Sequence, residues 1–267
     1  GWCIGVPSGW RKGKQRTFDI YAKSMSVCSD SSDDGGIGFF NPDLFTSNVD
    51  LERDDFDFGD GAVRVKLEYI HASNQLVETF VSRVIWPSAE AMCEYFASRP
   101  ELVKGKRVLE LGSGTGLCGI TLALLGAEQV VMTDYNDKAV KLLQGNIDLN
   151  GVAGTCSCYT LTWGCEQQAD QVIAKASAER ANGGKFDMVI GTDVVYEPEC
   201  IQPLLTSGKH MMNGNSAVFY LANHTHRYAG MEQQVKSTAT ELGLVEECLP
   251  CIRGEDGQID VSIFRLN

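Results

Sequence analysis

Basic residues are scarce in this sequence. Lys and Arg together number 23 against 35 Asp and Glu, which gives a formal net charge of −12 over 267 residues. A negative chain repels polyanions, so we expect no nucleic-acid partner, and a small molecule or a protein with a basic patch is favoured. The acid is concentrated in residues 29–34 and 50–60, so the rest of the chain is less acidic than the total implies.

The sequence also lacks the patterns of a membrane, secreted or zinc-binding protein. No apolar run is long enough to span a bilayer. The first residues carry Arg11, Lys12 and Lys14 without an apolar core, so we read the ten cysteines as reduced thiols of a cytoplasmic or nuclear protein. Cys248 and Cys251 form the only C-x-x-C pair, and no second pair completes a zinc ligand set. We therefore expect neither a metal nor a membrane partner.

A glycine-rich turn between a strand pattern and a helix pattern is present. An apolar run leads into the turn, and helix-forming residues resume over 116–125, as at a turn that holds a nucleotide. Gly112, Gly114 and Gly116 follow a G-x-G-x-G spacing, whereas a turn that binds a diphosphate needs its third glycine at position 117, which is Leu117. The spacing therefore argues against NAD and FAD.

An acidic residue closes the next strand pattern. Residues 129–133 form an apolar run that ends in Asp134, close to where a carboxylate accepts hydrogen bonds from both ribose hydroxyls of an adenosine. An adenosine without a diphosphate indicates S-adenosylmethionine as the cofactor. Strand, turn, helix, strand and acid in this order are a stronger signal than the turn alone.

Strand and helix patterns alternate along the chain. The expected strands cover 107–111, 129–133, 157–162, 186–191, 217–222, 245–249 and 259–266. The expected helices cover 89–97, 116–125, 137–149 and 231–242, and a long polar helix precedes the fourth strand. This order predicts an α/β fold with a Rossmann-like, seven-stranded, mostly parallel sheet and helices on both faces. The last two strands should pair as a C-terminal antiparallel hairpin.

The N-terminal part has a different character. Residues 1–60 mix Gly, Ser, Asp and isolated aromatics without sustained periodicity, so we expect an acidic, partly irregular extension there and one domain over 61–267. Apolar residues alternate with polar ones over 63–69 and again over 76–84. These two segments predict an N-terminal β-hairpin that precedes the main sheet.

Residues suited to ligand binding gather at four expected strand ends. In an open parallel sheet the ligand crevice lies beyond these carboxyl ends, which here carry the glycine turn, Asp134, Trp163, and Thr192 with Asp193. Over about residues 62–267 the chain resembles the seven-β-strand S-adenosylmethionine-dependent methyltransferases, and within them the methyltransferase-16 group of protein-lysine methyltransferases. The segments that carry the resemblance are Val84-Ile85-Trp86-Pro87-Ser88-Ala89, Glu110 to Gly116, Thr133-Asp134, Leu161-Thr162-Trp163-Gly164 and Asp193-Val194-Val195-Tyr196.

The resemblance implies which residues hold the cofactor and which face the substrate. Contacts with S-adenosylmethionine are implied for Trp86, Glu110, Gly112, Ser113, Gly114, Gly116, Asp134, Trp163 and Thr192. Asp193 and Tyr196 are the implied catalytic residues. We expect Asp193 to capture and orient the substrate amine, with a proton-accepting role left open, and Tyr196 to wall the channel that a lysine enters.

The expected function is methyl transfer from S-adenosylmethionine to a lysine side chain of a protein, by a monomeric enzyme. Two alternatives share the cofactor core: methylation of a protein histidine, and a non-catalytic module that binds S-adenosylmethionine. A nucleic-acid amine methyltransferase would be expected to carry Asn/Asp-Pro-Pro-Tyr after the fourth strand, where this chain has Asp193-Val194-Val195-Tyr196, and to have a basic face.

Overall fold

The main sheet of the protein is seen in a computed structural model that describes residues 51–70, 81–178, 184–248, 252–254 and 257–267. Its strands are β3 (Arg107–Leu111), β4 (Gln129–Asp134), β5 (Cys156–Thr160), β6 (Met188–Thr192), β7 (Val218–His224), β8 (Leu244–Cys248), β9 (Ile252–Gly254) and β10 (Gly257–Leu266). The strand order is β5-β4-β3-β6-β7-β10-β8, with β9 paired to β10 outside this path. From β5 to β7 all neighbours are parallel, and β10 is antiparallel to both β7 and β8. The predicted seven-stranded sheet with a C-terminal antiparallel hairpin is confirmed, and β9 adds a short strand to it.

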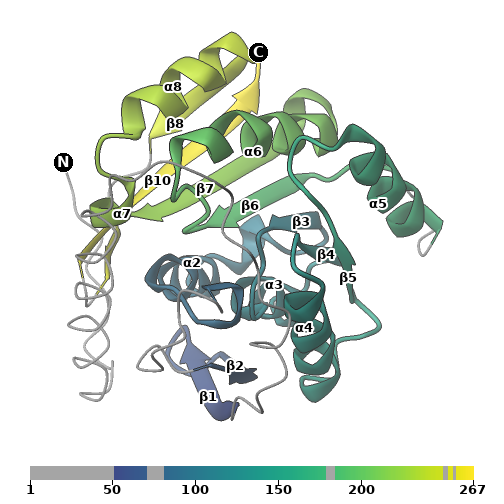
Figure 1. The fold of residues 1–267 in the computed structure, drawn as a ribbon. Coiled ribbons are helices and arrows are strands. Elements are labelled where there is room, and N and C mark those ends of the chain that lie inside the picture. Colours follow the sequence, from purple (N-terminus) through teal and green to yellow (C-terminus); the bar gives the residue numbers. More distant parts are fainter. Residues whose placement is uncertain (1–50, 71–80, 179–183, 249–251, 255–256) are drawn as a thin grey trace, which may run out of the picture.

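Helices cover both faces of this sheet (Figure 1). One face carries α2 (Pro87–Ala97), α3 (Leu117–Leu124) and α4 (Asp137–Leu149), and the other carries α5 (Glu166–Ala178), α6 (Pro198–Met211) and α8 (Glu232–Glu241). Side chains alternate along a strand, so Val108 of β3 joins the core under the first layer while Leu109 and Leu111 join the core under the second. Within the described residues, no helix is both long and apolar enough to cross a membrane.

A separate two-stranded sheet packs beside the first helical layer. It pairs β1 (Glu52–Phe58) with β2 (Val63–Tyr69) in antiparallel register. Alternate residues of β2 are buried, Val65 and Leu67 completely, and join the core formed by α2, α3 and α4. An N-terminal hairpin is therefore present, as predicted.

The strand that pairs with β2 differs from the prediction. Residues 81–83, expected to end the second strand, form the 3-10 helix η3 (Val81–Arg83), and the earlier part of that expected strand lies outside the described residues. The partner is β1, which falls in the segment expected to be irregular. Only Phe56 and Phe58 of β1 are buried, and exposed polar residues occupy the other five positions, so its sequence shows little of the apolar alternation that identifies a strand.

Helix α6 is absent from the sequence prediction. It begins with Pro198, a favoured residue at the first helical position, but it also contains Pro203, which normally interrupts a helix. Tertiary packing stabilises the helix despite Pro203, since Ile201, Leu204 and Leu205 are fully buried in the second core. The other connecting elements are short: η4 (Pro100–Leu102), η5 (Gly214–Ser216) and α7 (Thr225–Tyr228).

Candidate active site

The glycine turn lies where the strand order reverses, between β3 and its neighbour β6. Gly112 has a φ of 68°, and a Cβ added to it would lie 2.7 Å from Val194 Cγ1 and 3.1 Å from Trp163 Cζ2. Gly114 has a φ of 53°, and its added Cβ would lie 3.0 Å from the carbonyl oxygen of Ser82. Both positions thus require glycine for conformation and for space, because neighbouring protein atoms occupy the places where a side chain would begin.

Hydrogen bonds fix the turn to strand β4. The Ser113 N–H donates to the Thr133 carbonyl at 2.8 Å, and the Thr133 N–H donates to Ser113 Oγ at 3.1 Å. The Thr133 hydroxyl donates to the carbonyl of Glu110 at 2.8 Å. These hydrogen bonds hold the glycine turn and the carboxyl ends of β3 and β4 next to one another.

Asp134 lies at the carboxyl end of β4 and is 3% exposed. Its Oδ2 accepts the Gly114 N–H at 3.2 Å, and its Oδ1 accepts the Asn136 N–H at 3.0 Å. Burial raises the pKa of Asp134 to about 6, although these backbone donors favour the ionised form. At neutral pH the group is therefore a buried carboxylate next to the turn, suited to accept hydrogen bonds from ribose hydroxyls.

Glu110 is a second buried acid, on β3 itself. It is 2% exposed, and its Oε2 accepts the Gly119 N–H at 3.1 Å. Burial raises the pKa of Glu110 to about 8, against the opposing effect of hydrogen bonds from Ser113 and Gly119. The side chain is held beneath the turn, at the start of α3.

The remaining residues expected to hold the cofactor surround the same strand ends. Thr192 closes β6 and is 8% exposed, and Trp163 is partly buried against Gly112 and the second core. Trp86 is partly buried and immediately precedes α2. Gly116, with a φ of 85°, caps the start of α3, where a Cβ would lie 2.2 Å from Leu143 Cδ1. Its requirement for glycine comes from this positive φ and from packing against α4.

Asp193 follows β6 in a left-handed conformation with a φ of 53°, which is unusual for a residue other than glycine. Its side chain is 7% exposed. Oδ2 accepts the Ser88 N–H in the first turn of α2 at 2.8 Å, and Oδ1 accepts the His224 N–H at the end of β7 at 2.8 Å. The carboxylate thus joins three segments, including the one that carries Trp86, and it stabilises the N-terminus of α2.

Tyr196, three residues further on, is 45% exposed. Partial burial raises the pKa of its phenol to about 12, and Cys200 and Tyr135 add to this effect. Tyr135 is itself 57% exposed. Sequence reasoning missed Tyr135, although its position directly after Asp134 was a usable signal. Both tyrosines are exposed aromatic residues that closely follow strand ends, Tyr135 after β4 and Tyr196 after β6.

The residues at these strand ends fit S-adenosylmethionine. Gly112 and Gly114 present backbone without a side chain, and Asp134 places a buried carboxylate beside them. Together these features define a seven-strand, nucleoside-binding fold of the methyltransferase type.

Comparison with known proteins identifies the family. Residues 66–236 match the family described as lysine methyltransferase. The chain is 34% identical over 188 residues to protein N-lysine methyltransferase METTL21A of Danio rerio, covering 69% of this chain and 77% of that protein. It is 32% identical over 199 residues to EEF1A lysine methyltransferase 3 of Mus musculus, covering 71% and 76%. The chain belongs to the lysine methyltransferase family, and its cofactor is S-adenosylmethionine.

Solved structures agree with the fold. The 16S rRNA N2 G1207 methyltransferase RsmC of T. thermophilus, in complex with AdoMet and guanosine, superimposes with a TM-score of 0.55 at 16% identity, covering 81% of this chain and 51% of that chain. A transferase from Pyrococcus horikoshii gives a TM-score of 0.53 at 14% identity, covering 80% and 72%. At this level of identity the likeness concerns the fold alone.

Proposed function

We propose that the chain methylates a lysine of a partner protein. The lysine side chain enters the site beside Tyr196. The observation that carries the proposal is the joint placement of Asp134 on one side of the glycine turn and of Asp193 to Tyr196 at the end of the neighbouring strand β6. Similarity to lysine methyltransferases over most of the chain supports lysine as the acceptor.

The chemistry requires a neutral amine. When bound, S-adenosylmethionine supplies an activated methyl group and its own leaving group, so the main task of the protein is alignment. A lysine with a reference pKa of about 10.4 must lose a proton, which at pH 7 costs roughly 4.6 kcal/mol. An apolar channel lowers this cost because it disfavours the ammonium form. Tyr196, half-exposed at the crevice, is suited to form a wall of such a channel.

Asp193 is better suited to positioning than to capture of the amine. Both of its oxygens accept backbone N–H groups, from Ser88 and His224, and the side chain is buried. The capture role expected from the sequence finds no support in these contacts. We propose instead that Asp193 fixes the segment of Trp86 and the strand end that carries Tyr196. Asp193→Asn should therefore lower both thermal stability and cofactor affinity, whereas loss of amine capture alone would raise only the KM for the protein substrate.

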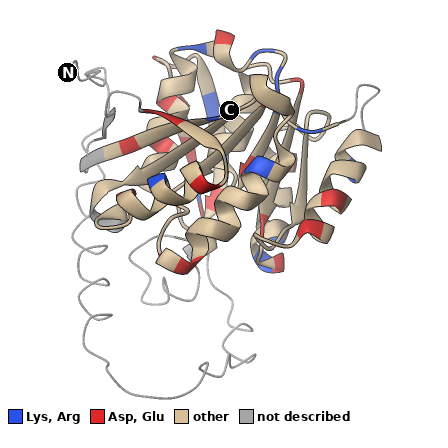
Figure 2. Ribbon diagram, turned by 90° about the horizontal axis from the view of Figure 1, so that it is seen from above, with Lys and Arg blue, Asp and Glu red and all other residues tan. Residues whose placement is uncertain are grey.

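The substrate is proposed to be a folded protein with a basic patch around the modified lysine. The named relative EEF1A lysine methyltransferase 3 supports a protein as the substrate, and the net charge of −12 complements a basic partner. In Figure 2 Lys and Arg are scattered singly among Asp and Glu, without a continuous basic band in this view. We propose that the enzyme acts as a monomer in the cytoplasm or nucleus, where cysteines remain reduced.

The test is transfer of tritium from methyl-labelled S-adenosylmethionine to a fractionated cell extract, followed by mass-spectrometric mapping of the labelled residue. Asp134→Asn, which keeps the size of the side chain but removes its charge, serves as the matched control. We expect label on a lysine of one protein band, lost in the control. Label on histidine or in nucleic acid would overturn the proposed acceptor. Cofactor binding without any transfer would favour a non-catalytic module.

A further inference from the structure

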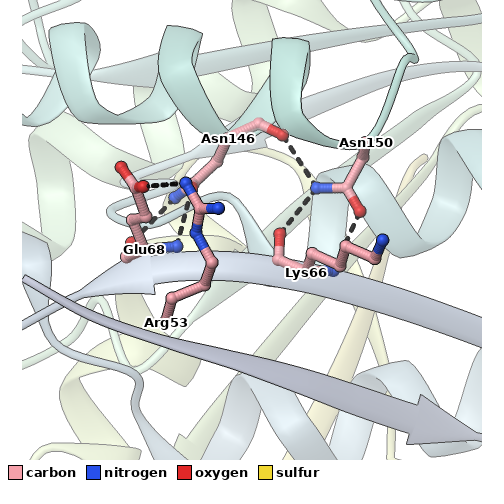
Figure 3. Close-up of polar contacts among 5 residues, drawn as sticks. All are labelled: Arg53, Lys66, Glu68, Asn146 and Asn150. Carbon is pink, nitrogen blue, oxygen red and sulfur yellow. Dashed lines mark hydrogen bonds and ion pairs between the residues drawn. The ribbon is translucent and has the colours of Figure 1, made fainter.

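Asn146 on α4 connects the N-terminal hairpin to the glycine turn. Its Oδ1 accepts the Glu68 N–H at 2.8 Å, and its Nδ2 donates to the Glu68 carbonyl at 3.0 Å. The amide thus pairs with the outer edge of β2 as a neighbouring strand would (Figure 3). The same Nδ2 also donates to the carbonyl of Thr115 at 2.9 Å. Thr115 stands between Gly114 and Gly116, so one fully buried side chain contacts both the hairpin and the turn.

Asn150, the C-cap residue of α4 and four positions beyond Asn146, makes similar contacts and provides a comparison. It forms the same pair of bonds with Lys66, accepting its N–H at 2.9 Å and donating to its carbonyl at 2.7 Å (Figure 3). Its third bond goes to the carbonyl of Asn146 at 2.8 Å, within its own helix. Asn150 therefore anchors the hairpin without the bond to the glycine turn that Asn146 makes.

The contact with Thr115 matters because the turn is conformationally permissive. The residues on either side, Gly114 and Gly116, both have positive φ values, of 53° and 85°, and glycine adopts many backbone conformations at little cost. Thr115 is 3% exposed, so its carbonyl is buried and a lost hydrogen bond there is not simply replaced by bulk water. The donor on Asn146 favours the conformation in which Gly114 also donates to Asp134.

We propose that Asn146 is a positioning residue for S-adenosylmethionine, through which docking of the β1–β2 hairpin holds the glycine turn in its binding conformation. The inference rests on the proposed use of this turn for the cofactor. It predicts reciprocal coupling: an intact hairpin contact strengthens cofactor binding, and bound cofactor protects the hairpin edge, since the linkage between two sites acts equally in both directions.

Asn146→Ala and Asn150→Ala form a matched pair for the test. Both remove two hydrogen bonds to β2, so both should lower the temperature of thermal unfolding. Only Asn146→Ala should weaken the equilibrium affinity for S-adenosylmethionine, by about threefold to tenfold, the effect of one buried hydrogen bond. Equal affinities of the two variants, at either the wild-type or a reduced level, would overturn the proposal.

Hydrogen exchange gives a readout that a purely structural role would not change. Added S-adenosylmethionine should slow exchange of the Glu68 amide in the wild type and in Asn150→Ala, but not in Asn146→Ala. Asn146→Asp keeps the acceptor for the Glu68 N–H and loses both Nδ2 bonds, to the carbonyls of Glu68 and Thr115. It is the second variant if Asn146→Ala does not fold, and cofactor affinity equal to that of Asn150→Ala would again overturn the proposal. Failure of the wild type to bind the cofactor would count against the proposed function, whereas normal binding with unchanged coupling would count against this inference alone.

Discussion

The cofactor side and the proposed substrate side of the site differ in how far their residues are buried and hydrogen-bonded within the chain. On the cofactor side, Glu110, Ser113 and Asp134 are all less than a tenth exposed and are hydrogen-bonded within the described structure. On the side assigned to the substrate, Tyr135 and Tyr196 are about half exposed. The first side is built by backbone conformation and buried carboxyl groups, and the second presents aromatic surface that a partner can cover. A change on the cofactor side should therefore affect every substrate, and a change on the other side should depend on the substrate.

The largest effect is expected for substitution of Asp134, on the affinity for S-adenosylmethionine. Asp134→Ala removes a buried carboxylate that also accepts the Gly114 N–H, and hydrogen bonds to a charged group contribute about 1.5–3 kcal/mol each. We expect at least about a 100-fold loss of affinity for S-adenosylmethionine, measured by calorimetric titration. A loss of methylation at normal cofactor affinity would place Asp134 on the substrate side and contradict the distinction between the two sides.

Gly112→Ala should have the next largest effect, on the stability of the fold. The new Cβ would lie 2.7 Å from Val194 at a φ of 68°, and strain plus overpacking should destabilise the fold by roughly 3 kcal/mol. Gly151 is the matched control, because it has a φ of 66° but no atom within 4 Å of an added Cβ. Denaturant unfolding of both alanine variants separates the two effects. Equal losses of stability would show that only backbone conformation matters at Gly112.

The buried acid Glu110 predicts a pH dependence of stability. Its pKa is raised to about 8, so the folded chain binds a proton more tightly than the unfolded chain does. The stability that this proton contributes is present at low pH and is lost as pH rises toward 8, by about 2 kcal/mol between pH 6 and 8. Glu110→Gln should flatten this part of the profile of unfolding free energy against pH. A wild-type profile that rises over the same range would contradict the assignment.

The smallest expected effect concerns charge on the substrate side. An acidic enzyme that meets a basic partner should lose a few-fold in kcat/KM between about 0.05 and 0.5 M salt, because screening slows encounter. The affinity for S-adenosylmethionine over the same range is the control, since its site is buried. A salt-independent kcat/KM would remove the support for a basic patch on the substrate.

Local patterns predicted the helices and strands around the glycine turn well. Helix α4 has the predicted bounds, Asp137–Leu149, and Asn136 caps it by accepting the N–H groups of Lys138 and Ala139. The glycine spacing likewise depends on neighbouring residues in the chain. Such features can be read from a short window because their physical causes lie within it.

Contacts between distant residues could not be predicted in this way. Asp193 and Ser88 are 105 positions apart, and Asn146 and Glu68 are 78 apart. The position of Asp193 in its motif indicated a substrate contact, whereas its backbone partners become visible only in the folded chain. Strand β1 was missed for a related reason, since its acid-rich sequence gains strand structure from pairing with β2.

The most direct test of the account measures binding and transfer on the same three proteins: the wild type, Asp134→Ala and Tyr196→Ala. Each is titrated with S-adenosylmethionine, and each is assayed for label on lysine in the same extract. The account predicts that Asp134→Ala loses both properties, whereas Tyr196→Ala keeps cofactor affinity within about twofold and loses most of the label on lysine, because Tyr196 serves only the substrate side. Parallel loss of cofactor affinity in both variants, or undiminished label on lysine in Tyr196→Ala, would contradict the division of the crevice into two sides.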